Sequence, residues 1–172
     1  MKKKTAPKKK ANVRKKVQPV PKGYHTVTPY LTVRGAAEAI DLYKRAFGAK
    51  ERSRMPGADG KTVMHAELSI GDSIVMLSDE LPMGSCKAPT TLGGTTTMIF
   101  LYVPNVDALF KRAEDAGCKT VRPLADMFWG DRYGTLEDPF GNQWGLATHK
   151  EDVTPKEMKR RTQEFMAQMA KA

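Results

Sequence analysis

The sequence predicts an α+β fold made of two copies of a βαβββ module, and three observations lead to this prediction. Leu-Thr-Val at residues 31–33 precedes one helical stretch, and Leu-Tyr-Val at residues 101–103 precedes a second one. Each helical stretch ends at a glycine. Three strand-like stretches follow each helix, so the same order of elements occurs twice, as in an internal repeat.

Module one is expected over residues 24–79. Apolar and polar residues alternate over residues 27–33, which is typical of a half-buried strand, and apolar residues then recur at helical spacing between Gly35 and Phe47. Gly48 ends this helix as a C-cap glycine does. The other strands of the module are expected at residues 50–54, 62–70 and 73–78.

Module two is expected over residues 95–149, after a linker at residues 80–94 that holds prolines and two adjacent glycines. Its helix shows apolar residues at i, i+3, i+4 and i+7 from Val106, and Gly117 ends it. A helix covers only one face of each sheet, so the other face is left for the partner module or a ligand. The strands of this module are expected at residues 118–122, 133–137 and 143–148.

The stretch from Trp129 to His149 holds the most unusual residues of the chain, and it predicts a hairpin. Turn residues at positions 138–142 separate two strand-like stretches, and a tight turn fixes their register. Side chains alternate along a strand, so the second strand has one roomy face and one bulky face. The roomy face carries Gln143, Gly145 and Ala147, and the bulky face carries Trp144, Leu146 and Thr148. The roomy face suggests a cavity wall.

Both ends of the chain are expected to lie outside the two modules. Residues 1–23 hold ten of the 29 Lys and Arg residues and no acid, so the remaining 19 basic residues balance the 19 acidic ones. Such a segment is expected to be a disordered arm, either a solubilising tail or a weak, salt-sensitive and non-specific contact for nucleic acid. Residues 150–172 are expected to form a helix that begins with a capping box at Thr154 and packs a methionine stripe on the body or a second subunit.

The composition excludes several classes of protein. The chain of 172 residues has 40% hydrophobic residues, which suffices for one well-buried domain, and no apolar run is long enough to span a bilayer. Cys86 and Cys118 stand far apart, which argues against a disulfide framework or a zinc knuckle and fits a reducing compartment. We therefore expect a cytoplasmic protein with two free thiols and no membrane contact.

Three stretches carry a family resemblance: TPYLTVRGAAEAIDLYKRAFGA from Thr28, HAELSIGDSIVMLSDE from His65 and DPFGNQWGL from Asp138. With the paired βαβββ plan, they resemble the vicinal oxygen chelate superfamily, which includes glyoxalases, bleomycin-resistance proteins and extradiol dioxygenases. The resemblance covers roughly residues 24–149. It implies that each module's mixed sheet curls into half of a cup. It also implies, for the metal enzymes of the family, ligands on the first and fourth strands of each module.

The metal-ligand positions implied by the resemblance fall on unsuitable residues in this chain. In module one they fall on Thr28 and Met76, and in module two on Met98 and Gly145. Divalent metals in this family bind imidazole and carboxylate groups, which these four residues do not supply. We therefore expect no metal and no other cofactor.

Several side chains remain as candidates for lining the cup. His65 and Glu67 share a strand face and suit a polar pair or an acid/base couple, although a surface or satisfied interior histidine is the commoner case. Arg132 beside Trp129 and Tyr133 suits an anionic or planar ligand, and a structural Arg–Asp pair is the alternative. The apolar and aromatic candidates, which serve equally well as core or dimer interface, are Tyr30, Met76, Met98, Phe100, Trp129, Tyr133 and Trp144.

Two classes of function follow from these residues. The first is a metal-free protein of the bleomycin-resistance kind that binds a small planar or aromatic molecule in a cup shared by a homodimer. The second is an enzyme of the superfamily, a lyase, isomerase or dioxygenase. It would be metal-dependent through ligands at other positions, or metal-free and using His65 and Glu67. We favour the binding protein, because the four ligand positions lack suitable donors.

Overall fold

The computed structural model describes residues 17–170 and has two four-stranded sheets. The strand order is β1-β4-β3-β2 in sheet one and β5-β8-β7-β6 in sheet two. Within the described residues the elements are, in chain order, β1 (Tyr30–Val33), α1 (Ala36–Phe47), β2 (Lys50–Pro56), β3 (Val63–Ile70), β4 (Ser73–Asp79), α2 (Pro89–Leu92), β5 (Met98–Tyr102), α3 (Val106–Ala116), β6 (Lys119–Asp126), β7 (Asp131–Glu137), β8 (Gln143–His149) and α4 (Pro155–Met169).

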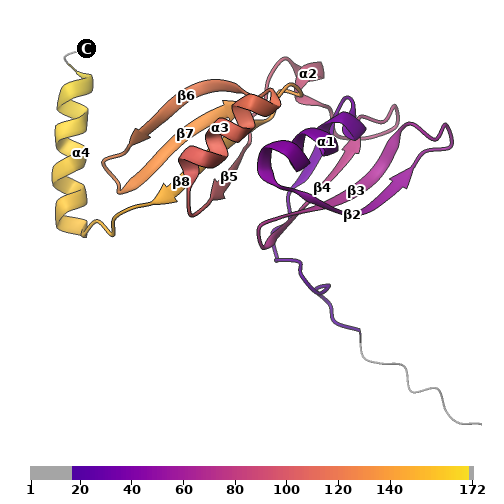
Figure 1. The fold of residues 1–172 in the computed structure, drawn as a ribbon, viewed down its shortest axis with the longest axis horizontal. Coiled ribbons are helices and arrows are strands. Elements are labelled where there is room, and N and C mark those ends of the chain that lie inside the picture. The colour runs from indigo at the N-terminus through magenta and orange to yellow at the C-terminus, as the bar shows by residue number, and fades with distance from the viewer. Residues whose placement is uncertain (1–16, 171–172) are drawn as a thin grey trace, which may run out of the picture.

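The predicted α+β fold of paired βαβββ modules is confirmed. In each module the first strand pairs in parallel with the fourth, β1 with β4 and β5 with β8, and the other pairs are antiparallel. The two sheets do not curl into the expected cup, because they lie uncurled beside each other (Figure 1). No strand of sheet one pairs with a strand of sheet two in the part of the chain that the structure describes, so β1 and β5 remain edge strands.

The hydrophobic core lies between the sheets and the two long helices of the modules. Helices α1 and α3 pack against each other on the same side of the molecule, as Figure 1 shows. Arg112 of α3 joins them by donating from Nε to the carbonyl of Ala46 in α1 over 2.8 Å. This arrangement covers one face of each sheet. Within residues 17–170 no helix lies over the opposite face, which is called the open face below.

The start of helix α1 is held by a side chain from the far end of its module. Gly35 takes the N-cap position with φ of 93° and has no side chain to satisfy the first helical N–H groups. Asp79, at the end of β4, accepts hydrogen bonds from the backbone nitrogens of Gly35 and Ala36 through Oδ1 and of Val63 through Oδ2. A single carboxylate therefore fixes α1 to β3 and β4.

The predicted hairpin of β7 and β8 is confirmed, and its turn joins the two modules. Asp138 accepts hydrogen bonds from the Tyr43 hydroxyl of α1 at 2.8 Å and from the Trp144 indole at 2.9 Å. It also accepts from the Asn142 side chain, and all four residues are buried. Burial and the charge of Asp138 hold the pKa of Tyr43 well above its usual value, and burial and the same charge raise the pKa of Cys118 to about 12. The DPFGNQW stretch therefore contributes a buried hydrogen-bond network to the core.

The first residues of the chain that the structure describes begin at position 17 and lead into module one. Residues 1–16 of the predicted basic arm lie outside the described residues, whereas residues 17–29 form turns without a helix or strand. Pro19, Val20 and Pro21 border a hollow together with Met76 of the open face of sheet one. The guanidinium of Arg52 lies 5.9 Å from the centre of the Tyr24 ring. Residues 17–23 themselves are exposed throughout.

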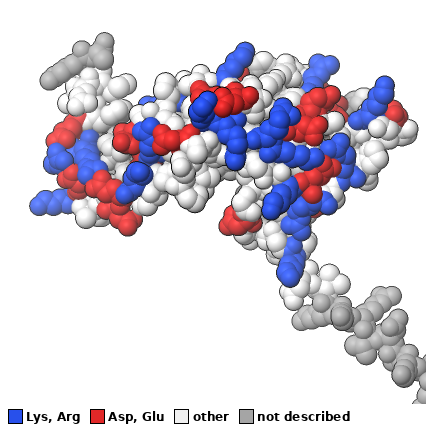
Figure 2. Space-filling model, viewed as in Figure 1, with Lys and Arg blue, Asp and Glu red and all other residues white. Residues whose placement is uncertain are grey.

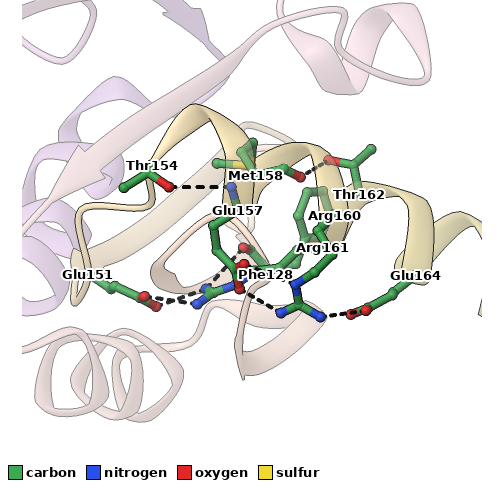
Figure 3. A network of polar contacts seen from close by, with 9 residues as sticks. All are labelled: Phe128, Glu151, Thr154, Glu157, Met158, Arg160, Arg161, Thr162 and Glu164. Carbon is green, nitrogen blue, oxygen red and sulfur yellow. Dashed lines mark hydrogen bonds and ion pairs between the residues drawn. The ribbon is translucent and has the colours of Figure 1, made fainter.

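The C-terminal helix α4 stands beside the outer end of sheet two (Figure 1), and Arg161 of this helix bonds Phe128 and Glu151. Thr154 caps it by accepting from the Glu157 nitrogen at 3.3 Å, as the capping box predicts. Arg161 pairs with Glu151 and Glu157, and Figure 3 shows this network around the Phe128 carbonyl. Among the described residues, the one aromatic contact of α4 joins Phe165 to Phe128, with ring centroids 5.0 Å apart, and the methionines Met166 and Met169 of the helix are exposed.

Two surface properties bear on the sequence predictions. Lysine and arginine side chains are interspersed with acidic ones over the helix-covered side (Figure 2), in keeping with the balanced charge outside the first 23 residues. Across residues 17–170, none of the helices is both long and apolar enough to cross a bilayer.

Candidate functional site

The candidate side chains fall into two groups, one on the open face of each sheet. The helix-covered faces carry the core residues, such as Leu77 in sheet one and Leu146 in sheet two. Eight of the ten candidates belong to open faces, whereas Arg132 and the buried Trp144 do not. The group on sheet one is Tyr30, His65, Glu67 and Met76, and the group on sheet two is Met98, Phe100, Trp129 and Tyr133.

An aromatic wall covers the open face of sheet two, and it consists of Phe100, Tyr102, Trp129 and Tyr133. The rings of Phe100 and Tyr133 stack with centroids 5.4 Å apart and planes 7° apart. Tyr102 lies 5.0 Å from Phe100, and Trp129 lies 6.0 Å from Tyr133. Phe100 and Tyr102 are 44% and 63% exposed, so the wall presents ring surface to solvent. We call these four residues the aromatic face.

A glycine allows the aromatic face to lie flat on its sheet. Gly145 pairs with Phe100 across β5 and β8, and a Cβ at this position would meet Met98 Sδ and Phe100 Cδ2 at 2.7 Å. The predicted alternation is correct, because Trp144 and Leu146 point into the core. The roomy face is nevertheless filled, since the side chains of Met98 and Phe100 lie over the glycine.

A hollow borders this face. It measures about 770 Å³, a size in the usual range for ligand pockets, and lies between the two modules. Phe100 and Tyr102 line it from β5, while Val27, Ile70 and Leu109 supply apolar wall from the other elements. A ligand on the aromatic face would therefore reach into an apolar hollow at the module boundary.

Two residues at the end of the aromatic face were not predicted, Asp131 and His149. Asp131 is only 4% exposed, and its Oδ2 accepts from the Tyr102 hydroxyl at 2.9 Å and the Trp129 indole at 3.1 Å. Its Oδ1 lies 2.8 Å from Nδ1 of His149, which pairs with it across β7 and β8. The other ring nitrogen of His149, Nε2, lies 3.0 Å from Asp152.

The electrostatics of this pair favour a charged imidazole. Burial raises the pKa of Asp131, but hydrogen bonds from His149, Tyr102 and Trp129 outweigh it, and the pKa ends below its usual value. The hydrogen bonds to Asp131 and then to Asp152 raise the pKa of His149. The alternation of residues 143, 145 and 147 could have identified His149, had it been extended by one more step. Asp131 is recognisable as a site residue only from its hydrogen bonds with Tyr102, Trp129 and His149 in the structure.

The open face of sheet one carries a polar group instead of an aromatic one. Tyr30 and Met76 are paired across β1 and β4, and Met76 is paired with Glu67 across β3 and β4, so all three share the face. The Tyr30 hydroxyl lies 3.2 Å from His65 Nδ1, and His65 Nε2 lies 3.5 Å from Glu67 Oε1. Hydrogen bonds from Tyr24 and then from His65 keep the pKa of Glu67 below its usual value. We call Tyr30, His65 and Glu67 the tyrosine–histidine cluster.

Arg132 was expected in the ligand cup, and the structure places it elsewhere. It pairs with Thr148 across β7 and β8, on the face opposite to its neighbour Tyr133. Its guanidinium makes a bidentate pair with Asp107 at the start of α3 and a longer contact with Asp126. The expectation failed because adjacent residues of a strand point to opposite faces. The structural Arg–Asp pair considered from the sequence is what the chain forms.

The four positions that the family resemblance assigns to metal ligands carry neither imidazole nor carboxylate groups in this chain. Thr28 precedes β1, and its hydroxyl donates a hydrogen bond to the carbonyl of His25 within a turn. His25, Thr28 and Met76 line the same hollow. Met98 offers a thioether and Gly145 has no donor atom. Across the described residues, no three His, Cys, Asp or Glu side chains are grouped so that they could hold a metal ion.

Comparisons with known proteins agree with this architecture. Residues 24–146 match the family model described as Glyoxalase/Bleomycin resistance protein/Dioxygenase superfamily. The chain is 47% identical over 135 residues to the uncharacterized protein Rv0887c of Mycobacterium tuberculosis strain H37Rv, covering 77% of this chain and 79% of that protein.

Solved structures show the same likeness. TioX from Micromonospora sp. ML1 is 31% identical with a TM-score of 0.59, covering 71% of this chain and 96% of TioX. Protein PA1353 from Pseudomonas aeruginosa is 25% identical with a TM-score of 0.58, covering 73% and 98%. With the family model matched over most of its length, the chain belongs to the glyoxalase/bleomycin resistance protein/dioxygenase superfamily.

Proposed function

We propose that this chain is a small-molecule-binding protein that holds a planar or aromatic ligand on its aromatic face. The observation that carries the proposal is the exposed pair of rings of Phe100 and Tyr102, with Phe100 stacked on the buried ring of Tyr133 and Trp129 beside Tyr133. Large exposed apolar patches mark interaction sites in monomeric proteins. Ring surfaces offset-stack on planar partners and add to the free energy of burial. An apolar hollow of ligand size lies next to these rings.

The proposed binding does not use a divalent metal. The four positions at which metal enzymes of the superfamily carry ligands hold a threonine engaged in a turn, two thioethers and a glycine. A hard cation requires oxygen or imidazole donors, which this set lacks. Ring stacking and apolar burial therefore supply the affinity.

A second copy of the chain completes the proposed site. No helix of the described part of the chain covers either open face, and the exposed aromatic face of one copy would be covered by the open face of sheet one of another copy. That face carries polar groups that suit the ligand's edge, the tyrosine–histidine cluster among them. The cup expected from the family resemblance would then form between two chains, since the sheets within one chain are uncurled.

The experiment uses the neutral fluorescent ring compound N-phenyl-1-naphthylamine, abbreviated NPN. The chain has two tryptophans, and Trp144 is fully buried, so quenching by a bound ring should report Trp129. We expect saturable NPN binding that Phe100→Ala weakens about tenfold, because a ring–ring contact and its buried area are lost. The control is Leu92→Ala, which removes an exposed apolar side chain of α2 that does not line the hollow beside the aromatic face. Equal NPN affinity in both variants would refute the proposal.

The tyrosine–histidine cluster supports a second candidate function, a metal-free enzyme of the same superfamily. Tyr30, His65 and Glu67 form a chain of groups able to hold and move a proton, which acid/base catalysis needs. In that case His65→Ala would abolish turnover of a substrate while NPN still binds to the aromatic face. If His65→Ala changes no turnover, the cluster only shapes the surface of sheet one.

A further inference from the structure

We infer that the ring bound on the aromatic face carries an acidic group, and that His149 donates a hydrogen bond to that group. The inference rests on the proposed function and adds the chemical class of the ligand. It is carried by the position of His149, by the two carboxylates at its ring nitrogens, and by the cations near the aromatic face.

The position of His149 is set by Asp131. His149 follows Ala147 by two residues on β8, so its side chain leaves the sheet on the same face as the aromatic residues. The Asp131 carboxylate binds His149 through Oδ1 and both Tyr102 and Trp129 through Oδ2. One buried carboxylate therefore ties the imidazole to two members of the aromatic face and fixes the orientation of the ring.

The protonation state follows from the second carboxylate. Asp131 faces Nδ1 at 2.8 Å and Asp152 faces Nε2 at 3.0 Å. A neutral imidazole has only one N–H, so it would direct a lone pair at one of the two carboxylates, whereas an imidazolium donates to both. The charged and titratable groups that face this pair are Asp131 from β7, Asp152 from the link to α4, and Tyr102 from β5, which bonds the same Asp131.

The two carboxylates are not equivalent as partners. Asp131 is buried and receives three hydrogen bonds, which hold it in place and keep it from solvent. The Asp152 side chain is 103% exposed, so its contact with Nε2 of His149 is surrounded by solvent. Exposed ion pairs are weak, so the acidic group of a ligand can take the place of Asp152 at Nε2. The imidazole then remains held by Asp131.

A second cation on the same face favours an acidic ligand over a basic one. Arg122 pairs with Thr135 across β6 and β7, and its guanidinium lies 6.0 Å from the centre of the Tyr133 ring. The aromatic face thus has Arg122 at one border and His149 at another, whereas Asp131 is screened by its donors. A ring with a carboxylate or sulfonate gains from both cations, and a ring with an ammonium group would be repelled by them.

The test compares two probes with the same ring system. 8-Anilinonaphthalene-1-sulfonate, abbreviated ANS, carries a sulfonate that stays ionised, and NPN lacks it. We expect the full-length protein to bind ANS more tightly than NPN at about pH 6, and this preference to fall as the pH rises through the pKa of His149. His149→Gln should lower the ratio of ANS to NPN affinity about tenfold at pH 6 and remove its pH dependence, because a charge-assisted hydrogen bond is lost.

Two further variants separate this role from a structural one. Asp152→Asn should strengthen ANS binding, because the competing carboxylate at Nε2 is gone, and a structural role of the pair predicts no such gain. Lys150→Gln removes a neighbouring positive charge and should leave the affinity ratio unchanged, since Lys150 acts on Asp107 at the other face. A ratio that is independent of pH, or equal in His149→Gln and Lys150→Gln, overturns the inference alone. NPN binding that Phe100→Ala does not weaken overturns the proposed function as well.

Discussion

The hydroxyl of Tyr43 donates a hydrogen bond of 2.8 Å to Asp138, although 95 residues separate the two along the chain. Tyr43 lies in helix α1 of module one and Asp138 in the β7–β8 turn of module two. Its ring also contacts Trp144 at 5.1 Å, edge to face. The pair therefore fixes the position of one module on the other, and the first prediction concerns its removal.

We expect Tyr43→Phe to lower the free energy of unfolding by about 1.5–3 kcal/mol, because a buried carboxylate loses a donor that water cannot replace. Urea denaturation followed by tryptophan fluorescence measures the change. The matched control is Tyr30→Phe, which removes a hydroxyl from an exposed residue and should change stability by less than about 0.5 kcal/mol. Equal effects in the two variants would mean that the Asp138 network does not join the modules.

Two glycines of sheet two should respond differently to an added methyl group. At Gly134 the Cβ would lie 2.7 Å from Phe110 and 3.0 Å from the backbone carbonyl of Arg122, so Gly134→Ala should cost about 1–3 kcal/mol of stability. At Gly145 it would meet only the side chains of Met98 and Phe100, which are half-exposed and can turn aside. Gly145→Ala should therefore weaken NPN binding with little change in melting temperature. Thermal melts and NPN titrations on both variants distinguish the two cases.

The purified protein should hold no stoichiometric divalent metal. The prediction follows from the donors at the family's ligand positions, namely Thr28, Met76, Met98 and Gly145. Elemental analysis of protein purified without chelators measures it. One zinc, nickel, manganese or iron per chain, lost in His65→Ala, would contradict the prediction and support the enzyme.

Stability should depend on pH through His149. Its folded pKa is raised, first by Asp131 and then by Asp152, so the imidazolium stabilises the folded chain below the unfolded pKa. This contribution is lost as the pH rises through the raised folded pKa. Between about pH 6 and pH 9, the melting temperature of the wild type should therefore fall relative to that of His149→Gln. Parallel melting curves across this range would show that His149 is not coupled to folding.

We expect the protein to be a homodimer that buries its aromatic face. Phe100, Tyr102 and Met98 are partly exposed side by side on β5, and such a surface is typical of an interface. Sedimentation equilibrium at micromolar concentrations tests the association. Phe100→Glu should shift it towards monomer, whereas Leu92→Glu, which places the same charge on exposed α2, should not. A wild type that stays monomeric would leave the shared cup without support.

The sequence predicted the fold because its indicators are local. The helix ends at Gly48 and Gly117 take positive φ in the structure, and the alternation of Trp144, Gly145 and Leu146 assigns each side chain to its correct face. The predicted strand at residues 27–33 was too long, because Thr28 bonds the His25 carbonyl and forms a turn instead.

The candidate site was predictable only in part, since its chemistry depends on distant partners. Phe100 and Tyr133 were identifiable as aromatic strand residues, but their stacking follows from the position of β5 beside β8 and β7. Asp131 is defined by Tyr102, 29 residues away, and by His149, 18 residues away, neither of which its own neighbourhood indicates. Arg132 was assigned to the wrong face of β7, because its neighbour Tyr133 points to the open face and Arg132 points to the other.

The Tyr43–Asp138 pair also has a consequence for synthesis on the ribosome. All strands of sheet one lie before residue 80, so a growing chain can close that sheet, including the parallel pair of β1 and β4, while module two is still being made. Helix α1 must then wait, with its Tyr43 hydroxyl and the ring of Phe47 unpaired, until the DPFGNQW turn emerges near the end of the fold. During that interval the half-made chain exposes an apolar helix surface that only its own second half covers, and this surface is where a chaperone would bind.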